Sequence, residues 1–290
     1  MDVSRTVLAA MPFIREFGIR TDPAGAPLPF HRNDGFEIVY IISGHYRWEL
    51  VNGKILDVRG RQLSMTIPNI LHRGYLDHQN PGRLVYIVFD PADPSFGDYT
   101  HLTAAESSTL QERMISLGNG TYSGSSNLDT TAASLFELQA AGLRSGHAAL
   151  DTAVICSGTV LFLLAAIQAI LQNRTYEQTS PITGLVEYIE GHLDEPFSLA
   201  RLEQISGWSR TRLYTLFSRH IGQSPNDFIQ SLRCDRARSF LEERDATVTD
   251  IAFELGFSSS QYFSRVFRKY TGLSPGEYRR RIRTGNRHHS

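Results

Sequence analysis

An internal repeat in the C-terminal third of this chain constrains its fold more than any other sequence feature. Leu199 to Ser209 matches Val248 to Ser258 at an offset of 49 residues, and after one inserted residue the match continues at an offset of 50. Each copy contains an apolar-periodic run, a glycine followed by an aromatic residue, a serine and a second apolar-periodic run. Because glycine commonly ends a helix and serine commonly begins one, each copy predicts a helix, a tight turn and a second helix. We therefore predict two helix-turn-helix units, at 199–220 and 248–270.

The segment between the two copies predicts one long helix. Ser224-Pro225 has the order of a capping residue followed by proline in the first turn, which is typical of a helix start. We expect a helix from Ser224 to Glu243 to hold the two units at a fixed separation.

Charge is distributed unevenly along the chain. The formal net charge is −1, but residues 196–290 contain 16 Lys and Arg against 9 Asp and Glu, whereas the residues before them contain 13 against 21. Basic side chains neutralise phosphates, and this neutralisation supplies most of the non-specific affinity of proteins for DNA. The C-terminal region is therefore the part that we predict to bind a polyanion.

The N-terminal region predicts a small all-β barrel or sandwich. Short runs rich in β-branched and aromatic residues alternate there with glycine, proline and asparagine. The predicted strands are 36–43, 46–51, 54–58, 63–68 and 83–89. Asn52-Gly53 also predicts a type I′ hairpin turn, which needs a positive φ at both central positions.

The most ambiguous segment is the apolar run from Ala153 to Leu171, whose length and apolarity approach those of a membrane span. Ser157, Thr159 and Gln168 interrupt it, and no Lys/Arg clusters flank it, so we expect no membrane span. We prefer a helix buried between domains or between subunits, and the functional version of that interpretation is a dimer interface.

These patterns divide the chain into four parts. Residues 1–100 form the predicted β domain, 101–174 a helical region for dimerisation or interdomain contact, and 182–283 an all-helical domain. The polar, proline-terminated segment 175–181 is the predicted linker.

The two cysteines, Cys156 and Cys234, are too few for a disulfide framework and too far apart for a metal-binding pair. Residues 1–17 carry charged side chains and lack the long apolar run of a secretory signal. These features predict a protein of the reducing cytoplasm.

Residues from about Ile182 to Arg281 resemble the DNA-binding domain of AraC/XylS-type transcription regulators. A single helix-turn-helix pattern is a weak signal, but a tandem pair with a long signature in its second copy is specific. The residues that match this signature are Ile251-Ala252, Gly256-Phe257-Ser258, Tyr262 to Tyr270, Gly272, Ser274-Pro275 and Tyr278-Arg279. The resemblance implies binding of double-stranded DNA through both units.

In the second unit the residues themselves agree with this resemblance. Its second helix predicts a buried stripe at helical spacing, formed by Phe263, Val266, Phe267 and Tyr270. Gln261, Arg265 and Arg268 fall on the opposite face. Gln can pair with adenine and Arg with guanine in the major groove, while Ser258 at the helix start suits a phosphate. This face is the predicted DNA contact, and a plain solvated face is the alternative.

The resemblance also assigns single positions in the second unit. It implies base contacts by Ser260, Gln261 and Arg265. We expect Arg268 and Lys269 to contribute to affinity for all DNA sequences more evenly.

In the first unit the resemblance implies base contacts by Thr211, Tyr214 and Thr215. Glu203 departs from the pattern, because helix-turn-helix units usually carry a small residue there, as Ala252 does in the second copy. We expect either a slightly opened helix pair or a carboxylate that turns outward.

The N-terminal half resembles, less specifically, the cupin-type sensor domain of many such regulators. His31, Glu37, Gly44 and His72 match the cupin pattern, but Asn33 stands where a second imidazole is expected. Imidazole and carboxylate ligands suit Fe, Mn or Zn, so the loss of one imidazole weakens a metal site. We prefer an organic-ligand pocket and expect no metal or cofactor. Hydrogen-bonded rim histidines without a ligand are the alternative.

Aromatic residues on the predicted strands offer walls for such a pocket. Tyr40, Trp48 and Tyr86 suit a sugar-sized ligand, although aromatic residues on barrel strands more often fill the core. The predicted effector-binding residues are His31, Glu37, Tyr40, Trp48 and His72.

These expectations combine into an α+β protein, with an N-terminal cupin-like β-barrel followed by helices and a C-terminal all-α domain with two helix-turn-helix motifs. The predicted function is sequence-specific, DNA-binding transcription regulation by a cytoplasmic homodimer without enzymatic activity. A small-molecule effector, such as a sugar or related metabolite, controls it. The alternatives are a cupin-type metal-dependent enzyme with an appended helical domain and a membrane-tethered regulator. The roles of activator and repressor, and RNA polymerase as a partner, stay open.

Overall fold

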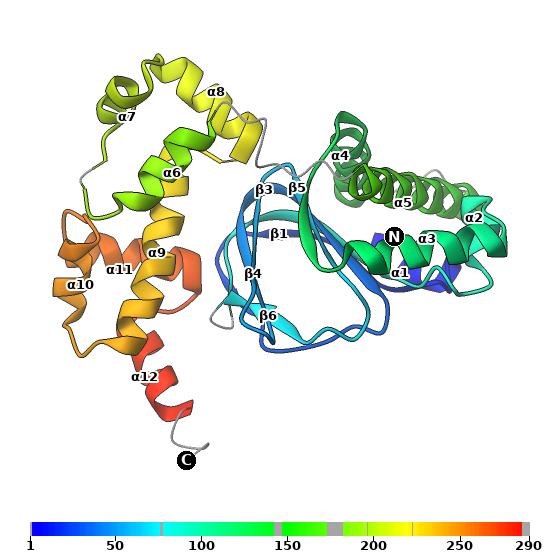
Figure 1. Cartoon of the computed structure of the whole chain (residues 1–290), viewed down its shortest axis with the longest axis horizontal. Helices are drawn as coiled ribbons and strands as arrows, with labels where there is room; N and C mark the ends of the chain where they lie inside the picture. The colour runs from blue at the N-terminus through cyan, green and yellow to red at the C-terminus, as the bar shows by residue number, and fades with distance from the viewer. Residues whose placement is uncertain are drawn as a thin grey trace.

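The computed structural model describes residues 2–75, 78–141, 147–172, 182–195, 197–221 and 223–285. The predicted linker, 175–181, lies outside the described residues. An antiparallel β-barrel occupies the middle of the molecule, with one group of helices on one side and the C-terminal helices on the other (Figure 1). This arrangement confirms the predicted α+β class.

The barrel strands are β1 (Ile14–Asp22), β2 (Ala26–Pro27), β3 (Phe36–Leu50), β4 (Ile55–Arg59), β5 (Gln62–Thr66), β6 (His72–Gly74), β7 (His78–Gln79), β8 (Gly82–Phe89) and β9 (Gly120–Ser123). The main sheet has the order β1-β8-β3-β5-β9, and β4 and β6 also pair with β3. Strands β2 and β7 form a separate two-stranded ribbon. The barrel is therefore organised around one long strand, β3.

Strand β3 replaces the two strands that the sequence predicts at 36–43 and 46–51. Its first half pairs with β5 and β8, and its second half pairs with β4 and β6. Between the halves, the register with β8 shifts between Ile41 and Ser43, and Gly44 has a φ of 110°. Glycine adopts this backbone conformation without a steric penalty, so it bends the strand instead of ending it.

The hairpin predicted at Asn52-Gly53 joins β3 to β4, but its turn is not type I′. Gly53 has a φ of 80°, whereas Asn52 does not have a positive φ. Instead, Lys54 N donates a hydrogen bond to Asn52 Oδ1 at 3.1 Å, and Gly53 N donates one to Leu50 O at 2.8 Å. The asparagine side chain thus organises the turn in place of a second left-handed residue.

The helices beside the barrel are α1 (Val3–Ala10), α2 (Phe96–Thr100), α3 (Ala104–Leu117), α4 (Ser126–Ala141) and α5 (Ala148–Leu171). One hydrophobic core joins the outer face of the sheet to α1, α4 and α5. Strand β9 lies in the region predicted to be helical and pairs with β5 in the same sheet. This core therefore extends across the domain boundary that the sequence predicts at residue 100.

Helix α5 is long and apolar enough to cross a membrane by length and composition alone. Its best window has a mean hydropathy of 2.4, and 44% of that window is buried. Such a helix is weak evidence for a span, because the core helix of a globular protein passes the same test. Its buried side packs against α1 and α4.

The C-terminal helices are α6 (Thr183–Gly191), α7 (Leu199–Ser206), α8 (Arg210–Ile221), α9 (Pro225–Glu243), α10 (Val248–Glu254), α11 (Ser260–Thr271) and α12 (Pro275–Gly285). Helix α9 is the long helix predicted from the sequence, and the Ser224 side chain caps it by accepting a hydrogen bond from Asp227 N. The first half of α9 packs with α6, α7 and α8, and its second half packs with α10, α11 and α12. The two helix-turn-helix units thus have separate cores on one shared helix.

Candidate nucleic-acid interface and small-molecule pocket

Helix α11 of the second unit has one buried and one exposed side. The predicted stripe of Phe263, Val266, Phe267 and Tyr270 is buried. Gln261, Arg265, Arg268 and Lys269 are exposed, and Ser260 is half-buried. The capping residue is Ser259, whose side chain accepts a hydrogen bond from Tyr262 N, and not Ser258 as the sequence suggested. The helix therefore presents a polar, cationic face to solvent.

Two of these cations differ in their surroundings. The Arg265 guanidinium lies 5.3 Å from the centre of the Tyr262 ring, which supports it without neutralising its charge. Lys269 Nζ lies 3.0 Å from Asp227 Oδ1 in a half-exposed ion pair. Burial by itself raises the pKa of Asp227, but hydrogen bonds from Ser224 and Lys269 outweigh it and lower that pKa. Arg265 is thus freer than Lys269 to meet an anionic partner.

Helix α8 of the first unit presents a neutral face. Thr211, Tyr214 and Thr215 are exposed there, and Thr215 Oγ1 donates a hydrogen bond to Thr211 O at 2.9 Å. The Glu203 carboxylate turns outward and lies 3.7 Å from Arg210 Nη2, so the second of the two expected arrangements is the one observed. Residues predicted to contact DNA thus lie on the outer faces of both second helices.

Sequence reasoning missed a buried arginine that joins the units. Arg233 of α9 donates hydrogen bonds from Nε to Leu193 O at 3.1 Å and from Nη1 to Gly256 O at 3.0 Å, and it also contacts Glu195 O. These carbonyls belong to the turn before α7 and to the turn between α10 and α11. The only signal in the sequence was a charged residue on the buried side of α9. Helical periodicity does not reveal what such a residue contacts.

A cavity of about 170 Å³ lies in the barrel. Four of the predicted effector-binding residues, His31, Glu37, Trp48 and His72, line it. Ligand pockets commonly measure about 300 Å³ or more, so this cavity suits a small molecule. Sequence reasoning missed further polar lining residues, namely Glu16, Arg20 and Gln79. They lie on β1 and β7, which the sequence did not indicate as strands.

Tyr40 does not line this cavity, so its prediction is wrong. Side chains alternate along β3, and Tyr40 therefore faces the helices while Val39 faces the barrel interior. The Tyr40 hydroxyl donates a hydrogen bond to Asp129 of α4. Tyr86 does line the cavity. Its ring lies directly against Gly18, and any side chain at position 18 would overlap that ring.

The polar centre of the cavity is the pair His72 and Glu37. His72 Nε2 lies 2.9 Å from Glu37 Oε2. Burial raises the pKa of Glu37, but the hydrogen bond and charge of His72 outweigh it and lower that pKa below 4.5. Burial lowers the pKa of His72, but the hydrogen bond and charge of Glu37 outweigh it and raise that pKa above 6.5. Each of the two groups therefore favours the charged state of the other.

His31, Glu37 and His72 could together hold a metal ion, because one donor atom from each lies within 4.8 Å of the others. The Nδ1 atoms of both histidines lie within hydrogen-bond distance of backbone carbonyls, Pro29 O at 3.0 Å and Ile70 O at 2.9 Å. However, His72 Nε2 and Glu37 Oε2 already face and pair with each other. Two of the three potential metal donors are therefore paired with each other in this structure.

Two family models match the chain. One is described as an AraC-like ligand binding domain and matches residues 13–118. The other is described as a helix-turn-helix domain and matches residues 202–281. The first range contains strands β1 to β8 and the residues that line the cavity, and the second contains nearly all of both helix-turn-helix units.

Curated relatives match the C-terminal region. An uncharacterized HTH-type transcriptional regulator of Staphylococcus aureus (strain COL) is 34% identical over 107 residues, which are 37% of this chain and 14% of that protein. LumQ of Photobacterium leiognathi, named a probable transcriptional regulator, is 34% identical over 96 residues, which are 33% of this chain and 39% of that protein. The chain thus spans well under half the length of these relatives.

Among solved structures, the DNA-binding domain of AdpA in complex with a target DNA is 28% identical with a TM-score of 0.35. That match covers 37% of this chain and 96% of the AdpA domain. The family models thus place an AraC-like ligand binding domain and a helix-turn-helix domain in that order on one chain, which are the two domains that the sequence resemblance to AraC-type transcription regulators implied.

Proposed function

We propose that this protein is a sequence-specific, DNA-binding transcription regulator whose activity is controlled by a small molecule bound in the barrel. The observation that carries the proposal is the face of α11, where Gln261, Arg265 and Arg268 are exposed opposite a fully buried apolar stripe. Such a helix fits the major groove, where Arg recognises guanine and Gln recognises adenine through paired hydrogen bonds.

The shared helix α9 supports a two-groove mode of binding. Successive major grooves on one side of B-DNA lie about 34 Å apart, and two recognition helices on a rigid connection can enter both. Thr211, Tyr214 and Thr215 of α8 then meet one groove, and Ser260, Gln261 and Arg265 of α11 meet the other. Each monomer reads an asymmetric site, so a dimer uses direct repeats more naturally than a tight palindrome.

Selection of bound fragments from genomic DNA by the full chain tests DNA recognition. We expect enrichment of a discrete set of sites, and we expect the affinity for them to fall steeply as salt rises, because bound counterions are released from the phosphates. Binding that is independent of salt, or recovery of fragments in their input proportions, contradicts the proposal.

We propose that the effector is a small, polar metabolite such as a sugar. The cavity offers the charged pair His72 and Glu37, and Gln79 Oε1 is buried there without a hydrogen-bond partner among the described residues. Trp48 Nε1 is already bonded to Ser64 Oγ at 2.9 Å, so its ring is left to pack on an apolar ligand face. Hydroxyl groups on one side and C–H groups on the other make a ligand of this class complementary to the cavity.

The two tryptophans give a direct test of this pocket. Trp48 lines the cavity and Trp208 lies in the first helix-turn-helix turn, so a Trp208→Phe protein reports on the cavity alone. We expect a saturable change in Trp48 fluorescence with metabolites related to the genes beside the selected DNA sites. Glu37→Gln is expected to weaken that binding by about tenfold or more, because a bond to a charged group is lost. A response that survives Glu37→Gln unchanged places the ligand elsewhere.

A short route connects the cavity to the DNA-binding helices. Gln79 lines the cavity, and the next residue, Asn80, accepts a hydrogen bond at 3.0 Å from Arg238 Nη2 of α9. Arg238 Nη2 also donates to Tyr270 O of α11 at 3.2 Å. A ligand that binds Gln79 therefore touches the residue next to Asn80, and Asn80 bonds to the arginine that supports α11. This short connection favours effector control of DNA binding.

We propose that the protein is a homodimer and that α5 forms its interface. Leu150, Val154 and Leu161 are 56%, 40% and 58% exposed and recur along one side of this helix. A shallow depression between α4 and α5 continues the same surface. In sedimentation experiments we expect a dimer at micromolar concentration, a monomer for Leu161→Glu, and a dimer for the control Ser108→Glu, which adds the same charge at an exposed polar position of α3, away from this face of α5. A monomeric unmodified chain contradicts the dimer.

The competing function is a cupin-type enzyme that uses a metal. It depends on the donors His31, Glu37 and His72, and Asn33 does not line the cavity that they share. Stoichiometric Fe, Mn or Zn in purified protein, lost in His72→Gln, would favour the enzyme over an organic-ligand sensor.

Both cysteines are free and buried, which supports action in the reducing cytoplasm, where the chromosome also lies.

A further inference from the structure

The barrel holds both helix-turn-helix units at the ends of their second helices. Gly60 N, between β4 and β5, donates a hydrogen bond at 2.9 Å to the carbonyl of Ile221, the last residue of α8. Gly25 N, beside β2, donates one at 3.0 Å to the carbonyl of Lys269 near the end of α11. A side chain at Gly25 would overlap the neighbouring Tyr270 carbonyl, so the backbones meet closely there. One rigid barrel thus touches both recognition helices.

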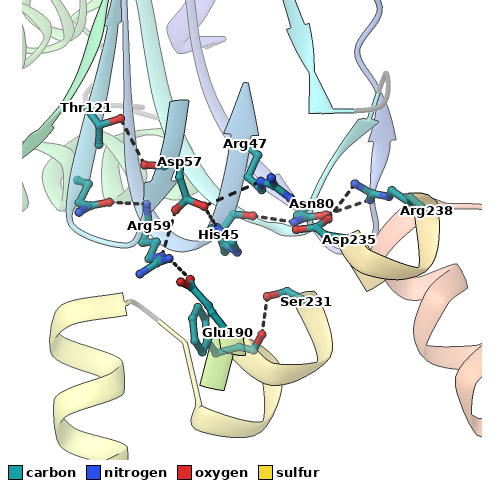
Figure 2. A network of polar contacts seen from close by, with 12 residues as sticks. His45, Arg47, Asp57, Arg59, Asn80, Thr121, Glu190, Ser231, Asp235 and Arg238 are labelled. Carbon is teal, nitrogen blue, oxygen red and sulfur yellow. Dashed lines mark hydrogen bonds and ion pairs between the residues drawn. The ribbon is translucent and has the colours of Figure 1, made fainter. Parts of the chain in front are cut away.

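A buried arginine strengthens the attachment at the second unit. Arg238 is only 1% exposed and bonds to Asp235 Oδ1 at 3.0 Å, to Tyr270 O at 3.2 Å and to Asn80 Oδ1 at 3.0 Å. Figure 2 shows Asn80 between the barrel and this arginine, and Asn80 Nδ2 in turn donates to His45 O at 2.9 Å. Because buried charge-assisted hydrogen bonds are costly to leave unmade, this contact resists separation of the two surfaces.

The first unit has a second attachment as well. Arg59 of β4 pairs with Glu190 of α6, as Figure 2 shows, and its guanidinium lies 5.4 Å from the centre of the Phe228 ring of α9. The His45 ring lies 5.9 Å from the same phenylalanine. The barrel therefore contacts α6, α8, α9 and α11 along one continuous surface.

The hydrophobic cores of the two units are separate, and the other connection between the units is α9 with the backbone contacts of its Arg233. We propose that the barrel acts as a template that fixes the distance and rotation between α8 and α11, and thereby sets the spacing of the two DNA segments that one monomer reads. The proposal rests on the DNA-binding function proposed above. Gly25, Gly60, Asn80 and Arg238 are positioning residues in this account and do not touch DNA.

DNA geometry makes the proposal measurable. One extra base pair between the two segments shifts the second by about 3.4 Å and rotates it by about 35° around the helix axis. A pair of helices held by α9 and by the barrel tolerates this change poorly. A pair held by α9 alone can adapt, because the preorganisation that the barrel supplies is lost.

The experiment compares spacing tolerance in the full-length protein. A site is first selected from random duplexes with the unmodified chain, and affinities are then measured for that site and for versions with one base pair inserted or removed between its halves. Gly25→Ala pushes a methyl group against the Tyr270 carbonyl, and Asn80→Ala removes the bond to Arg238. Gly184→Ala is the control, because a Cβ there meets nothing within 4 Å and the residue is exposed on α6.

For the unmodified chain and for Gly184→Ala, we expect each spacing change to weaken binding by about tenfold or more. For Gly25→Ala and Asn80→Ala, we expect the same change to weaken binding by about threefold or less, with circular dichroism spectra unchanged. For each protein, the readout is the ratio of its affinity for the selected site to its affinity for the site with altered spacing. A general loss of folded protein lowers both affinities alike and leaves this ratio unchanged. If either barrel variant folds and keeps the full spacing penalty, the template is wrong while DNA binding stands. If the unmodified chain selects no site, the proposed function itself fails.

Discussion

The two helix-turn-helix units are built alike but carry different chemistry on their second helices. The exposed face of α11 holds Arg265, Arg268 and Lys269, whereas the face of α8 predicted to meet DNA holds Thr211, Tyr214 and Thr215. Charged side chains supply affinity through phosphates and guanine, while hydroxyl groups contribute weaker and less selective contacts. From this comparison we propose that the second unit anchors the protein on DNA and that the first refines the choice of site.

The turns of the two units also differ, although their backbones agree. Gly207 and Gly256 have φ values of 69° and 70°. A Cβ at Gly207 would meet nothing within 4 Å, whereas one at Gly256 would overlap the Arg233 guanidinium. The second turn is therefore packed against the arginine that joins the units, and the first turn is open.

The largest expected effect is on the stability of these turns. Gly207→Ala should lower the free energy of unfolding by about 1–2 kcal/mol, because alanine is strained in the left-handed conformation. Gly256→Ala should cost about 2–4 kcal/mol, since it carries the same strain and also displaces Arg233 from its backbone carbonyls. Urea unfolding of both variants measures the difference. Equal losses would mean that Arg233 does not depend on the second turn.

The next effect concerns base recognition by the second unit. Arg265→Ala should lose on the order of 1–3 kcal/mol of binding free energy and relax the preference at one base position. The matched change on the first unit is Arg212→Ala, which removes an exposed arginine of α8, and we expect it to leave base preference intact. Titration against single-base variants of the selected site measures both. Unchanged preference in the Arg265→Ala protein would show that another face of α11 meets the bases.

A smaller effect is expected from the cations that follow Arg265. Arg268→Ala or Lys269→Ala should weaken binding to all DNA sequences by a similar factor and reduce the slope of log affinity against log salt by about 1. Lys269 should give the weaker loss of the two, because it is paired with Asp227. Salt titrations on specific and random duplexes test this, and a loss confined to one sequence would argue against a phosphate contact.

The smallest effect is expected in the first unit. Thr215→Ala should cost less than about 1 kcal/mol of binding free energy, because a neutral hydroxyl contact is exchanged for water. Thr215→Val keeps the methyl group and separates apolar contact with thymine from hydrogen bonding. Losses as large as that of Arg265→Ala would reverse the comparison between the units.

Much of the DNA-binding region could be predicted from sequence because its signals are local. The repeat indicated both units, and Ser224-Pro225 located the start of α9, which Ser224 caps as expected. Exposure of Gln261 and Arg265 followed from helical periodicity. The register of the cap was missed, since three consecutive serines, Ser258 to Ser260, stand where α11 begins and the sequence does not distinguish which of them is the cap.

The barrel was harder to predict because its arrangement depends on contacts between distant residues. Tyr40 was assigned to the pocket on residue type alone, although the alternation along β3 turns it toward the helices. Gly44 was taken as the end of a strand, because nothing local distinguishes a bend from a turn. Gln79 lies in the two-residue strand β7, and Asn80 follows it. A strand of this length has no periodic pattern that the sequence could reveal.

The most direct test of the account is a footprint of the full-length protein on a selected site, read at single-nucleotide resolution. We expect protection in two successive major grooves, centred about 34 Å apart on the same side of the duplex. In the Arg265→Ala protein we expect protection to weaken at the groove read by α11 and to persist at the other. Protection of one groove only, or of grooves on opposite sides of the duplex, would contradict the claim that both helix-turn-helix units read DNA together.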